Sequence, residues 1–308
     1  MMGIVMAAAA AVSAITAPGP IGALSGTHVD AGKGSPVVLI LPGSGPTDRD
    51  GNSPLGIKGA SYRLLADALA LRGISSVRSD KRGLFASKSA VADGNAVTLA
   101  DYAVDAHNWI SAIRARTGIK CVWLAGHSEG GLIALTAAQR PDGVCGVMAI
   151  ASPGRKLGEI LRQQLRSNPA NTPILDSALA AITELEAGRR VDVTGMNPAL
   201  QPLFAPSVQG YMIDLMAADP ARLAHGLKVP LLIVHGSEDL QMSAADADVL
   251  HKAQPRSRLV TVPGMNHVLK QVAAGDRSAN LAAYADPSLP IDPTLVEAIV
   301  SFVGGKSN

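Results

Sequence analysis

The residues best suited to nucleophilic chemistry centre on Ser128, in the pentapeptide GHSEG at residues 126–130. An apolar, β-type run, CVWLA, precedes it, and the helix-forming run GLIALTAA follows it. This order predicts a sharp strand–turn–helix junction, in which flanking glycines avoid a clash and the serine oxygen is lifted out of the sheet edge. The free N–H groups that begin the helix favour a developing negative charge. Ser128 is the predicted nucleophile, and an ordinary Gly/Ser turn is the alternative.

A serine needs a base to take its proton and a carboxylate to orient that base. In chains with this type of turn, the order along the sequence is serine, acid, histidine. Of the seven histidines, His267 follows the strand-like run RLVTV and lies on a turn, where a base can be presented. The alternative for His267 is a solvated loop side chain. The other six precede the serine, lie in the turn or in a predicted helix, or come before the candidate acid: His28, His107, His127, His225, His235 and His251.

The predicted acid is Asp239, which follows the buried-strand pattern PLLIVHG. Its neighbour Glu238 competes for the role, but a strand followed by Gly-x-x-Asp is the more usual pattern at such a strand end. Asp239 could instead cap the helix that begins near Ala244, although Ser243 is better placed to do so.

Two backbone N–H groups are expected to stabilise the oxyanion of a tetrahedral intermediate. One belongs to Glu129, the residue after the nucleophile. The other is assigned to Ser44, with Gly45 as second choice, because the loop at residues 42–52 follows an apolar strand at residues 37–41. Three charged residues of this loop are expected to lock it by salt bridges rather than to contact substrate: Asp48, Arg49 and Asp50.

Strand-like and helix-like segments alternate along the chain, which predicts an α/β fold with a mostly parallel, doubly wound sheet. The candidate residues all fall at the carboxyl ends of strands, where such sheets bind ligands. The predicted strands lie at residues 37–41, 75–79, 121–126, 144–151, 230–235 and 258–262, after a hairpin near 20–32. The predicted helices lie at residues 60–72, 98–116, 129–140, 243–254 and 292–303.

Residues 154–226 break this rhythm and show helical spacing instead, which predicts a helical cap inserted into a core formed by residues 18–153 and 227–308. Most of its apolar side chains are expected to pack the cap itself. A minority should line a substrate pocket. The residues assigned to this pocket are Phe204, Tyr211, Met212 and Met216 of the cap, and Phe85 at the entrance.

With these motifs in place, the chain resembles the α/β-hydrolase superfamily, and within it the bacterial serine esterases that carry a loop such as PGSGPTDRDGN at residues 42–52. The other shared motifs are DKRG at residues 80–83, GHSEG at 126–130 and GMNHVLK at 264–270. The resemblance implies hydrolysis of carboxylic esters, with Ser128, Asp239 and His267 as the triad and no cofactor. The segment after DKRG is less glycine-rich than is usual, so the entrance beside Phe85 is expected to differ.

Two other functions are open. A peptidase or amidase shares this machinery and differs only in its cap and pocket. A binding protein of the same fold usually lacks a member of the triad, whereas all three candidates are present here.

The chain has 308 residues, of which 47% are hydrophobic, so it can bury a sizeable core. Its formal net charge is +2, and it contains no run of like charges. Nucleic acid is therefore not an expected partner. The resemblance implies a small-molecule ester as the partner. Aromatic residues make up 3%, which argues against stacking of sugars or bases. No cluster of cysteine and histidine has metal-ligand spacing.

Residues 1–17 are Ala-rich and apolar, too short to span a bilayer well, and similar to a secretory signal peptide with a cut after Ala14 or Ala17. They lack the usual basic residue, so a disordered tail is the alternative. Export is the favoured prediction, and a cytoplasmic location follows otherwise.

Cys121 lies seven residues before Ser128, and Cys145 lies seven residues before Ser152, at the expected end of the next strand. If those strands are adjacent, the sulfur atoms are neighbours at the end of the sheet away from the site. Adjacent strands seldom suit a disulfide, so two buried free thiols are expected. An oxidising compartment would favour the bond.

Overall fold

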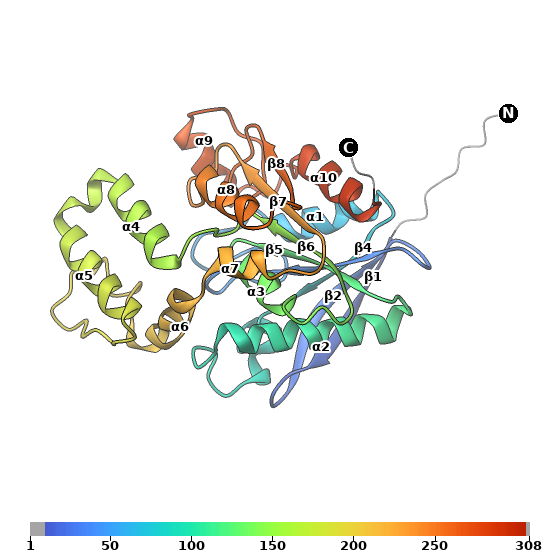
Figure 1. Cartoon of the computed structure of the whole chain (residues 1–308), viewed down its shortest axis with the longest axis horizontal. Helices are drawn as coiled ribbons and strands as arrows, with labels where there is room; N and C mark the ends of the chain where they lie inside the picture. Colours follow the sequence, from blue (N-terminus) through green and yellow to red (C-terminus); the bar gives the residue numbers. More distant parts are fainter. Residues whose placement is uncertain (1–9, 306–308) are drawn as a thin grey trace.

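An eight-stranded sheet forms the centre of the molecule (Figure 1). The computed structural model describes residues 10–305. The strand order is β1-β2-β4-β3-β5-β6-β7-β8; β1 and β2 run antiparallel to their neighbours, and the others are parallel. The predicted mostly parallel sheet is therefore confirmed. The strands are β1 (Ala11–Pro18), β2 (Ala23–Asp30), β3 (Val37–Leu41), β4 (Ser75–Ser79), β5 (Val122–His127), β6 (Val144–Ile150), β7 (Leu231–Gly236) and β8 (Arg258–Val262).

Helices cover both faces of this sheet. Helices α2, α3 and α8 pack on one face, and α1 and α10 pack on the other. The α-helices are α1 (Ser61–Ala70), α2 (Leu99–Thr117), α3 (Glu129–Ala137), α4 (Leu157–Ser167), α5 (Leu175–Glu186), α6 (Pro206–Ala217), α7 (Pro220–His225), α8 (Ala244–Ala253), α9 (Arg277–Ala282) and α10 (Pro293–Val303), and the 3-10 helices are η1 (Phe85–Ala90), η2 (Pro169–Ile174) and η3 (Ala283–Ala285). Within the described residues, no helix has the length and apolar content needed to cross a membrane.

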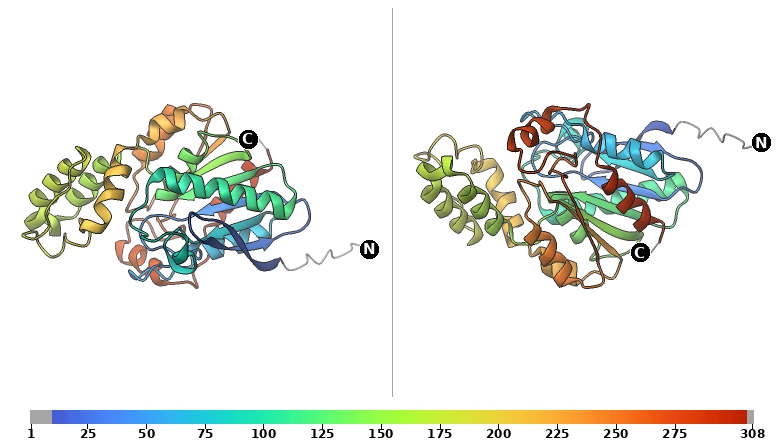
Figure 2. Two further views of the ribbon diagram at one scale, coloured as in Figure 1. Left: turned by 90° about the horizontal axis from the view of Figure 1, so that it is seen from below. Right: turned by 90° about the horizontal axis from the view of Figure 1, so that it is seen from above.

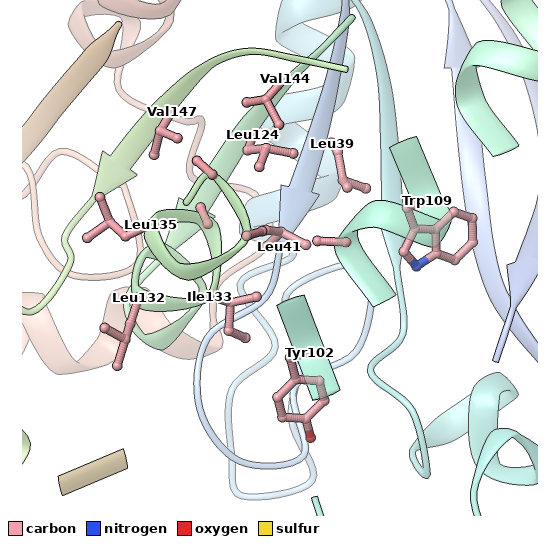
Figure 3. Packing of buried hydrophobic residues seen from close by; sticks show 14 of the residues in the cluster. Leu39, Leu41, Tyr102, Trp109, Leu124, Leu132, Ile133, Leu135, Val144 and Val147 are labelled. Carbon is pink, nitrogen blue, oxygen red and sulfur yellow. The ribbon is translucent and has the colours of Figure 1, made fainter. Parts of the chain in front are cut away.

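The core has two layers, because a parallel sheet covered on both sides buries both faces of its strands. All five residues of β3 are buried, with Leu39 and Leu41 facing α2 and α3, and Val38 and Ile40 facing α1. Figure 3 shows the first layer, in which Trp109 of α2 lies beside the strands. This continuous apolar packing holds the strand ends at one level, so the loops that leave them are brought together.

The start of the chain differs from its prediction. Residues 11–18 form β1, which pairs along its whole length with β2, from Ala11 opposite Asp30 to Pro18 opposite Ala23. Ile15 and Ala17 are buried in the core. The hairpin is therefore longer and begins earlier than the predicted 20–32, and a disordered tail is wrong for residues 11–17. Alternating burial of side chains, rather than a change in composition, marks this strand. Residues 1–9 of the predicted signal segment lie outside the described residues.

Residues 154–226, the segment predicted to be a cap, contain α4, η2, α5, α6 and α7. Helices α4, α5 and α6, yellow-green in Figure 2, stand to one side of the sheet. They enclose a small apolar cluster of their own that includes Ile182, Leu185 and Phe204. Helix α7 packs instead against α3 and α8 of the main body.

Most other predicted elements occur within three residues of their expected ends. Strands β3, β4 and β8 have the predicted bounds. Helix α3 ends at Ala137, three residues earlier than predicted, ahead of the turn that Pro141 makes with Val144. Helix α9 was not predicted, since its six residues are too few to show a helical period.

Cys121 and Cys145 form a disulfide, with their Cα atoms 5.1 Å apart, so the expected free thiols are wrong. As predicted, they lie at the amino ends of adjacent parallel strands β5 and β6, away from the loops that carry the candidate site. Both residues are half-buried rather than fully buried. The register between β5 and β6 shifts beside the bond, between Val122 and Trp123.

The disulfide should contribute to stability by restricting the unfolded chain. Replacing both residues (Cys121→Ser with Cys145→Ser) is expected to lower the free energy of unfolding by roughly 3 kcal/mol, given a closed loop of this length. Urea unfolding would measure the loss. Wild-type protein unfolded under reducing conditions is the control and should show a similar loss; an unchanged unfolding midpoint in the double variant would contradict the prediction.

Candidate active site

Ser128 lies in the turn between β5 and α3 with backbone angles φ 54° and ψ −125°, a region that a residue with a side chain rarely adopts. The turn can close only because of the glycines around it. A Cβ atom on Gly126 would lie 2.1 Å from the carbonyl oxygen of Gly130, and one on Gly130 would lie 2.2 Å from that of Leu41. The predicted strained turn is present, and it places Ser128 at the amino end of α3.

The loop at residues 42–52 lies directly beside this turn. A Cβ atom on Gly43 would be 3.3 Å from Cβ of Ser128, so the backbone approaches the serine closely. Two of the three charged residues of the loop, Arg49 and Asp50, form ion pairs as predicted, whereas Asp48 accepts hydrogen bonds from backbone N–H groups within the loop. Arg49 binds the Asp80 carboxylate through its side chain, with Nη2 at 2.5 Å, and Asp50 pairs with Arg78. These pairs fasten the loop to β4 and leave its amino-terminal end, at Ser44 and Gly45, next to the serine.

The base and the acid predicted from the sequence are joined. Nδ1 of His267 lies 2.8 Å from Oδ2 and 3.0 Å from Oδ1 of Asp239. The backbone N–H groups of Gln241 and Met242 also donate to Oδ1. Burial alone would raise the pKa of the Asp239 carboxyl, but the charge of His267 and these hydrogen bonds hold it below its usual value. An ionised Asp239 accepts the Nδ1 proton, which leaves Nε2 of His267 as the basic nitrogen.

The alternatives to Asp239 occupy other positions. The carboxylate of Glu238 accepts a hydrogen bond from the backbone of Gly275 at 3.0 Å, and Ser237 donates to it at 3.3 Å. Ser243 caps α8 in a reciprocal capping box with Asp246. Asp239 is therefore free of the capping role.

The turn that presents His267 is held by its neighbours. Asn266 and Lys270 exchange two hydrogen bonds, from the Asn266 N–H to the Lys270 carbonyl at 2.9 Å and from the Lys270 N–H to Oδ1 of Asn266 at 3.0 Å. Leu269 has a positive φ of 65° between them. Both Asn266 and Lys270 are fully buried, so this turn is anchored in the interior and does not depend on solvent.

His127, excluded as the base, instead joins two loops of the site and helix α1 to the end of β5. Its Nε2 lies 2.8 Å from the backbone carbonyl of His267, and its Nδ1 lies 2.8 Å from the hydroxyl of Tyr62. Because the carbonyl can only accept, Nε2 carries the proton and Nδ1 accepts the proton of the Tyr62 hydroxyl. The Gly43 N–H donates to the same hydroxyl at 3.0 Å. A continuous chain of hydrogen bonds thus connects Gly43, Tyr62, His127 and His267.

A cavity of about 460 Å³ opens beside Ser128 and Glu129. Its wall is mostly apolar and comes both from the main body and from helices α4 and α6. This volume lies within the range of small-molecule sites. The side chains that line it are Pro46, Leu84, Val97, Leu132, Pro153, Leu157, Ile160, Leu161, Leu203, Val208, Met212, Leu215, Ala218, Pro220 and Met242, with the polar Ser44, Lys81, Asn95, Tyr102, Ser128, Glu129, Arg155 and Tyr211.

Two of the five residues assigned to the pocket lie on its wall, namely Tyr211 and Met212. Phe204 is 0% exposed and, with Met216, packs in the apolar cluster of the inserted helices. Phe85 is 42% exposed at the start of η1, and its neighbour Leu84 lines the cavity instead. The assignments of Phe204 and Met216 are therefore wrong, because helical spacing alone does not distinguish the two sides of a small helical cluster. That of Phe85 is also wrong, because a loop motif does not show which of two neighbouring side chains faces the cavity.

The sequence reasoning assigned no role to Lys81, although its motif DKRG was singled out. Lys81 follows Asp80 after β4 and forms a buried ion pair with Glu129, 3.2 Å from Nζ to Oε1. Tyr102 and Tyr211 lie beside this pair, with their rings in edge contact 5.6 Å apart. Burial raises the pKa of both hydroxyls, so both tyrosines stay protonated at neutral pH. The position of DKRG at a strand's carboxyl end was the signal that could have pointed to Lys81.

Within residues 10–305, no cluster of three or more cysteine, histidine, aspartate or glutamate side chains could hold a metal ion.

The buried histidine at position 127 should make stability depend on pH. Burial, and to a smaller degree the neighbouring His267, lowers the pKa of His127 from 6.5 to about 3. Below pH 6.5 the unfolded chain therefore binds a proton that the folded chain does not, and the free energy of unfolding falls as the pH falls. One such group contributes up to about 1.4 kcal/mol per pH unit.

Urea unfolding between about pH 7.5 and pH 4.5 would measure this dependence. His127→Gln is expected to have a shallower slope than the wild type over the acid part of the range, whatever its stability at neutral pH. His225→Gln, on the surface, is the control. Equal slopes in the wild type and His127→Gln would contradict the assignment.

Comparisons with known proteins agree with this architecture. Residues 56–271 match the family described as serine aminopeptidase, S33. Esterase EstD of Thermotoga maritima is 27% identical over 238 residues, which are 76% of this chain and 54% of that protein. The chain therefore spans about half the length of this curated relative.

Solved structures show the same fold at low sequence identity. The esterase Pf2001 of Pyrococcus furiosus has a TM-score of 0.59 at 14% identity, with 97% of this chain and 92% of that chain covered. Proline iminopeptidase of Mycobacterium smegmatis has a TM-score of 0.58 at 16% identity, with 96% and 98% covered. Together with the family match over most of its length, these similarities show that the chain has the α/β-hydrolase fold and belongs to the serine aminopeptidase S33 family.

Proposed function

We propose that this chain is a serine hydrolase that cleaves carboxylic esters with small to medium acyl chains through an acyl-enzyme. The observation that carries the proposal is the buried His267–Asp239 pair, at 2.8 Å, on the same sheet edge as the strained Ser128 turn. The identity to esterase EstD supports the ester class. No cofactor is required, because the three side chains supply the nucleophile, the base and its orienting group.

In the proposed mechanism, Nε2 of His267 accepts the Ser128 proton as the serine oxygen attacks the ester carbonyl. The imidazolium that forms is stabilised by the ionised Asp239 at Nδ1. His267 then protonates the leaving alcohol. A water molecule, deprotonated by His267, attacks the acyl-enzyme, and the acid is released as His267 returns this proton to the Ser128 oxygen. Asp239 remains a carboxylate throughout, in accord with its lowered pKa.

The tetrahedral intermediates need two donors for their negative oxygen. We assign these to the backbone N–H groups of Glu129 and Ser44. The N–H of Glu129 lies in the first turn of α3, where it has no partner within the helix. Ser44 follows Gly43, whose backbone approaches Ser128 closely. Gly45 is the second choice for this donor, since it also lines the cavity.

The charges around the cavity favour an uncharged ester over a peptide with a free amino terminus. A substrate ammonium group in an apolar cavity would need a carboxylate partner. Among the residues that line the cavity, Glu129 has the one carboxylate, and Lys81 is paired with it. Peptidase or amidase activity remains the second candidate, supported by the family description and the likeness to a proline iminopeptidase.

Export to an oxidising compartment is part of the proposal. The Cys121–Cys145 disulfide supports it, since such bonds persist mainly outside the cytosol. A cut after Ala14 would remove half of β1 and a cut after Ala17 all but its last residue, so a leader that leaves this strand whole must end before Ala11.

Initial rates on p-nitrophenyl esters of increasing acyl length, beside a matching p-nitroanilide, would test the substrate class. We expect ester turnover with an optimum at intermediate length, and a loss of at least about 10⁴-fold in kcat for Ser128→Ala. Ser111→Ala, exposed on α2, is a matched serine control. Activity on the anilide alone would move the enzyme to the amidases, and an active Ser128→Ala would refute the mechanism.

Substitution of each carboxylate in turn tests whether Asp239 or Glu238 orients His267. Asp239→Asn is expected to lower kcat by about 10⁴-fold, because an amide no longer fixes the Nδ1–H form of His267. Glu238→Gln should remain within about threefold of the wild type, since its carboxylate contacts the loop at Gly275. Steady-state rates of both variants would decide between them, and the reverse order of effects would assign the acid to Glu238.

A further inference from the structure

We propose that Lys81 is a positioning residue of the oxyanion hole: it holds the peptide unit between Gly43 and Ser44 in place and neutralises the carboxylate of Glu129. Both proposed oxyanion donors, the N–H groups of Ser44 and Glu129, would thus depend on one ammonium group. This inference rests on the proposed function, and it adds a residue that is not part of the triad.

The contacts of Lys81 converge on the residues that flank Ser128. Its Nζ donates to the Gly43 carbonyl at 2.8 Å and to Oε1 of Glu129 at 3.2 Å. It also lies over the Tyr102 ring, 5.5 Å from the centroid. The Lys81 side chain is 6% exposed and that of Glu129 is 9% exposed, so both charges are largely removed from water. A buried ammonium group is retained at such a position only if its partners compensate the loss of hydration.

The contact with Gly43 bears on Ser44 through the geometry of the peptide bond. The Gly43 carbonyl and the Ser44 N–H belong to one planar trans unit and point in opposite directions, so fixing the first fixes the second. On its other side, Gly43 donates its own N–H to Tyr62. Both peptide units that flank Gly43 are therefore held. A Cβ atom at residue 43 would be tight, 3.3 Å from that of Ser128, so a glycine suits this close approach, and these two hydrogen bonds restrict its conformational freedom.

The contact with Glu129 acts through charge. The Glu129 side chain begins at the residue whose N–H is a proposed oxyanion donor, and it lines the same cavity as Ser128. An unpaired carboxylate there would oppose the negative charge that develops on the substrate oxygen, strongly so at low dielectric. The Lys81 ammonium cancels that charge. Removal of Lys81 would thus both release the Ser44 peptide and leave a carboxylate unpaired.

A double-mutant cycle of Lys81→Met and Glu129→Gln, measured on the best ester, separates the two effects. Lys81→Met is expected to lower kcat by about 10- to 10³-fold and change KM by less than about threefold. The affinity for an alkyl boronic acid, which forms a tetrahedral adduct with the serine, should fall by the same factor as kcat/KM. In the Glu129→Gln background, Lys81→Met should still lower kcat by about tenfold, because the Gly43 contact is lost in either background.

Lys252→Met, on the exposed end of α8, is the matched control and should keep wild-type kcat and boronate affinity. If Lys81→Met lacks a cooperative unfolding transition, Lys81→Gln takes its place under the same criteria. Wild-type kcat and boronate affinity in the folded Lys81 variant would overturn the proposal. A rise in KM with kcat unchanged would also overturn the proposal. A wild-type kcat in the double variant would do the same.

Ester turnover and Ser128 labelling of the wild-type protein distinguish a failure of this inference from a failure of the proposed function. A wild-type protein that hydrolyses none of the esters and is not labelled at Ser128 by an alkyl fluorophosphonate would refute the esterase proposal itself. A wild type that is active and labelled, with an equally active Lys81→Met, would refute only the role of Lys81.

Discussion

The site depends on one backbone constraint, the tight turn between β5 and α3. Gly126 and Gly130 approach so closely that neither could carry a side chain, and Ser128 between them is held at a positive φ. Strain of this kind persists only when the surrounding structure compensates for it. Here the buried strands β3, β5 and β6 supply the compensation, since Leu41 packs against the turn and the Ser128 N–H bonds to the Ile150 carbonyl.

Around this turn, hydrogen bonds rather than apolar contacts set the relative positions of the loops. His127 donates to the carbonyl of His267 and accepts from Tyr62, which in turn accepts from Gly43. The loop that presents the base and the loop proposed to bind the oxyanion are thereby joined through one imidazole. Because every member of this chain is buried, an unmatched group in it would cost about 1–3 kcal/mol, which favours a single arrangement.

Buried and half-buried ion pairs perform the same task farther out. Arg49 with Asp80 fastens the loop after β3, Arg82 with Asp105 fastens the segment after β4 to α2, and Arg155 with Asp246 fastens the start of the inserted helices to α8. Such pairs add little net stability, since desolvation offsets much of their attraction. They do favour one geometry, because either partner left alone would be an uncompensated buried charge.

The sequence alone determined the features that local chemistry controls: the order of strands and helices, the elbow at Ser128, and Asp239 and His267 at the ends of β7 and β8. Apolar runs bounded by glycines carry that information directly. Tertiary structure decided what depends on contacts between distant segments. It paired residues 11–18 into the sheet, joined Cys121 to Cys145, buried Phe204 away from the cavity and brought Lys81 to Gly43 and Glu129. Which face of an element is covered depends on its neighbours, and a one-dimensional pattern does not contain them.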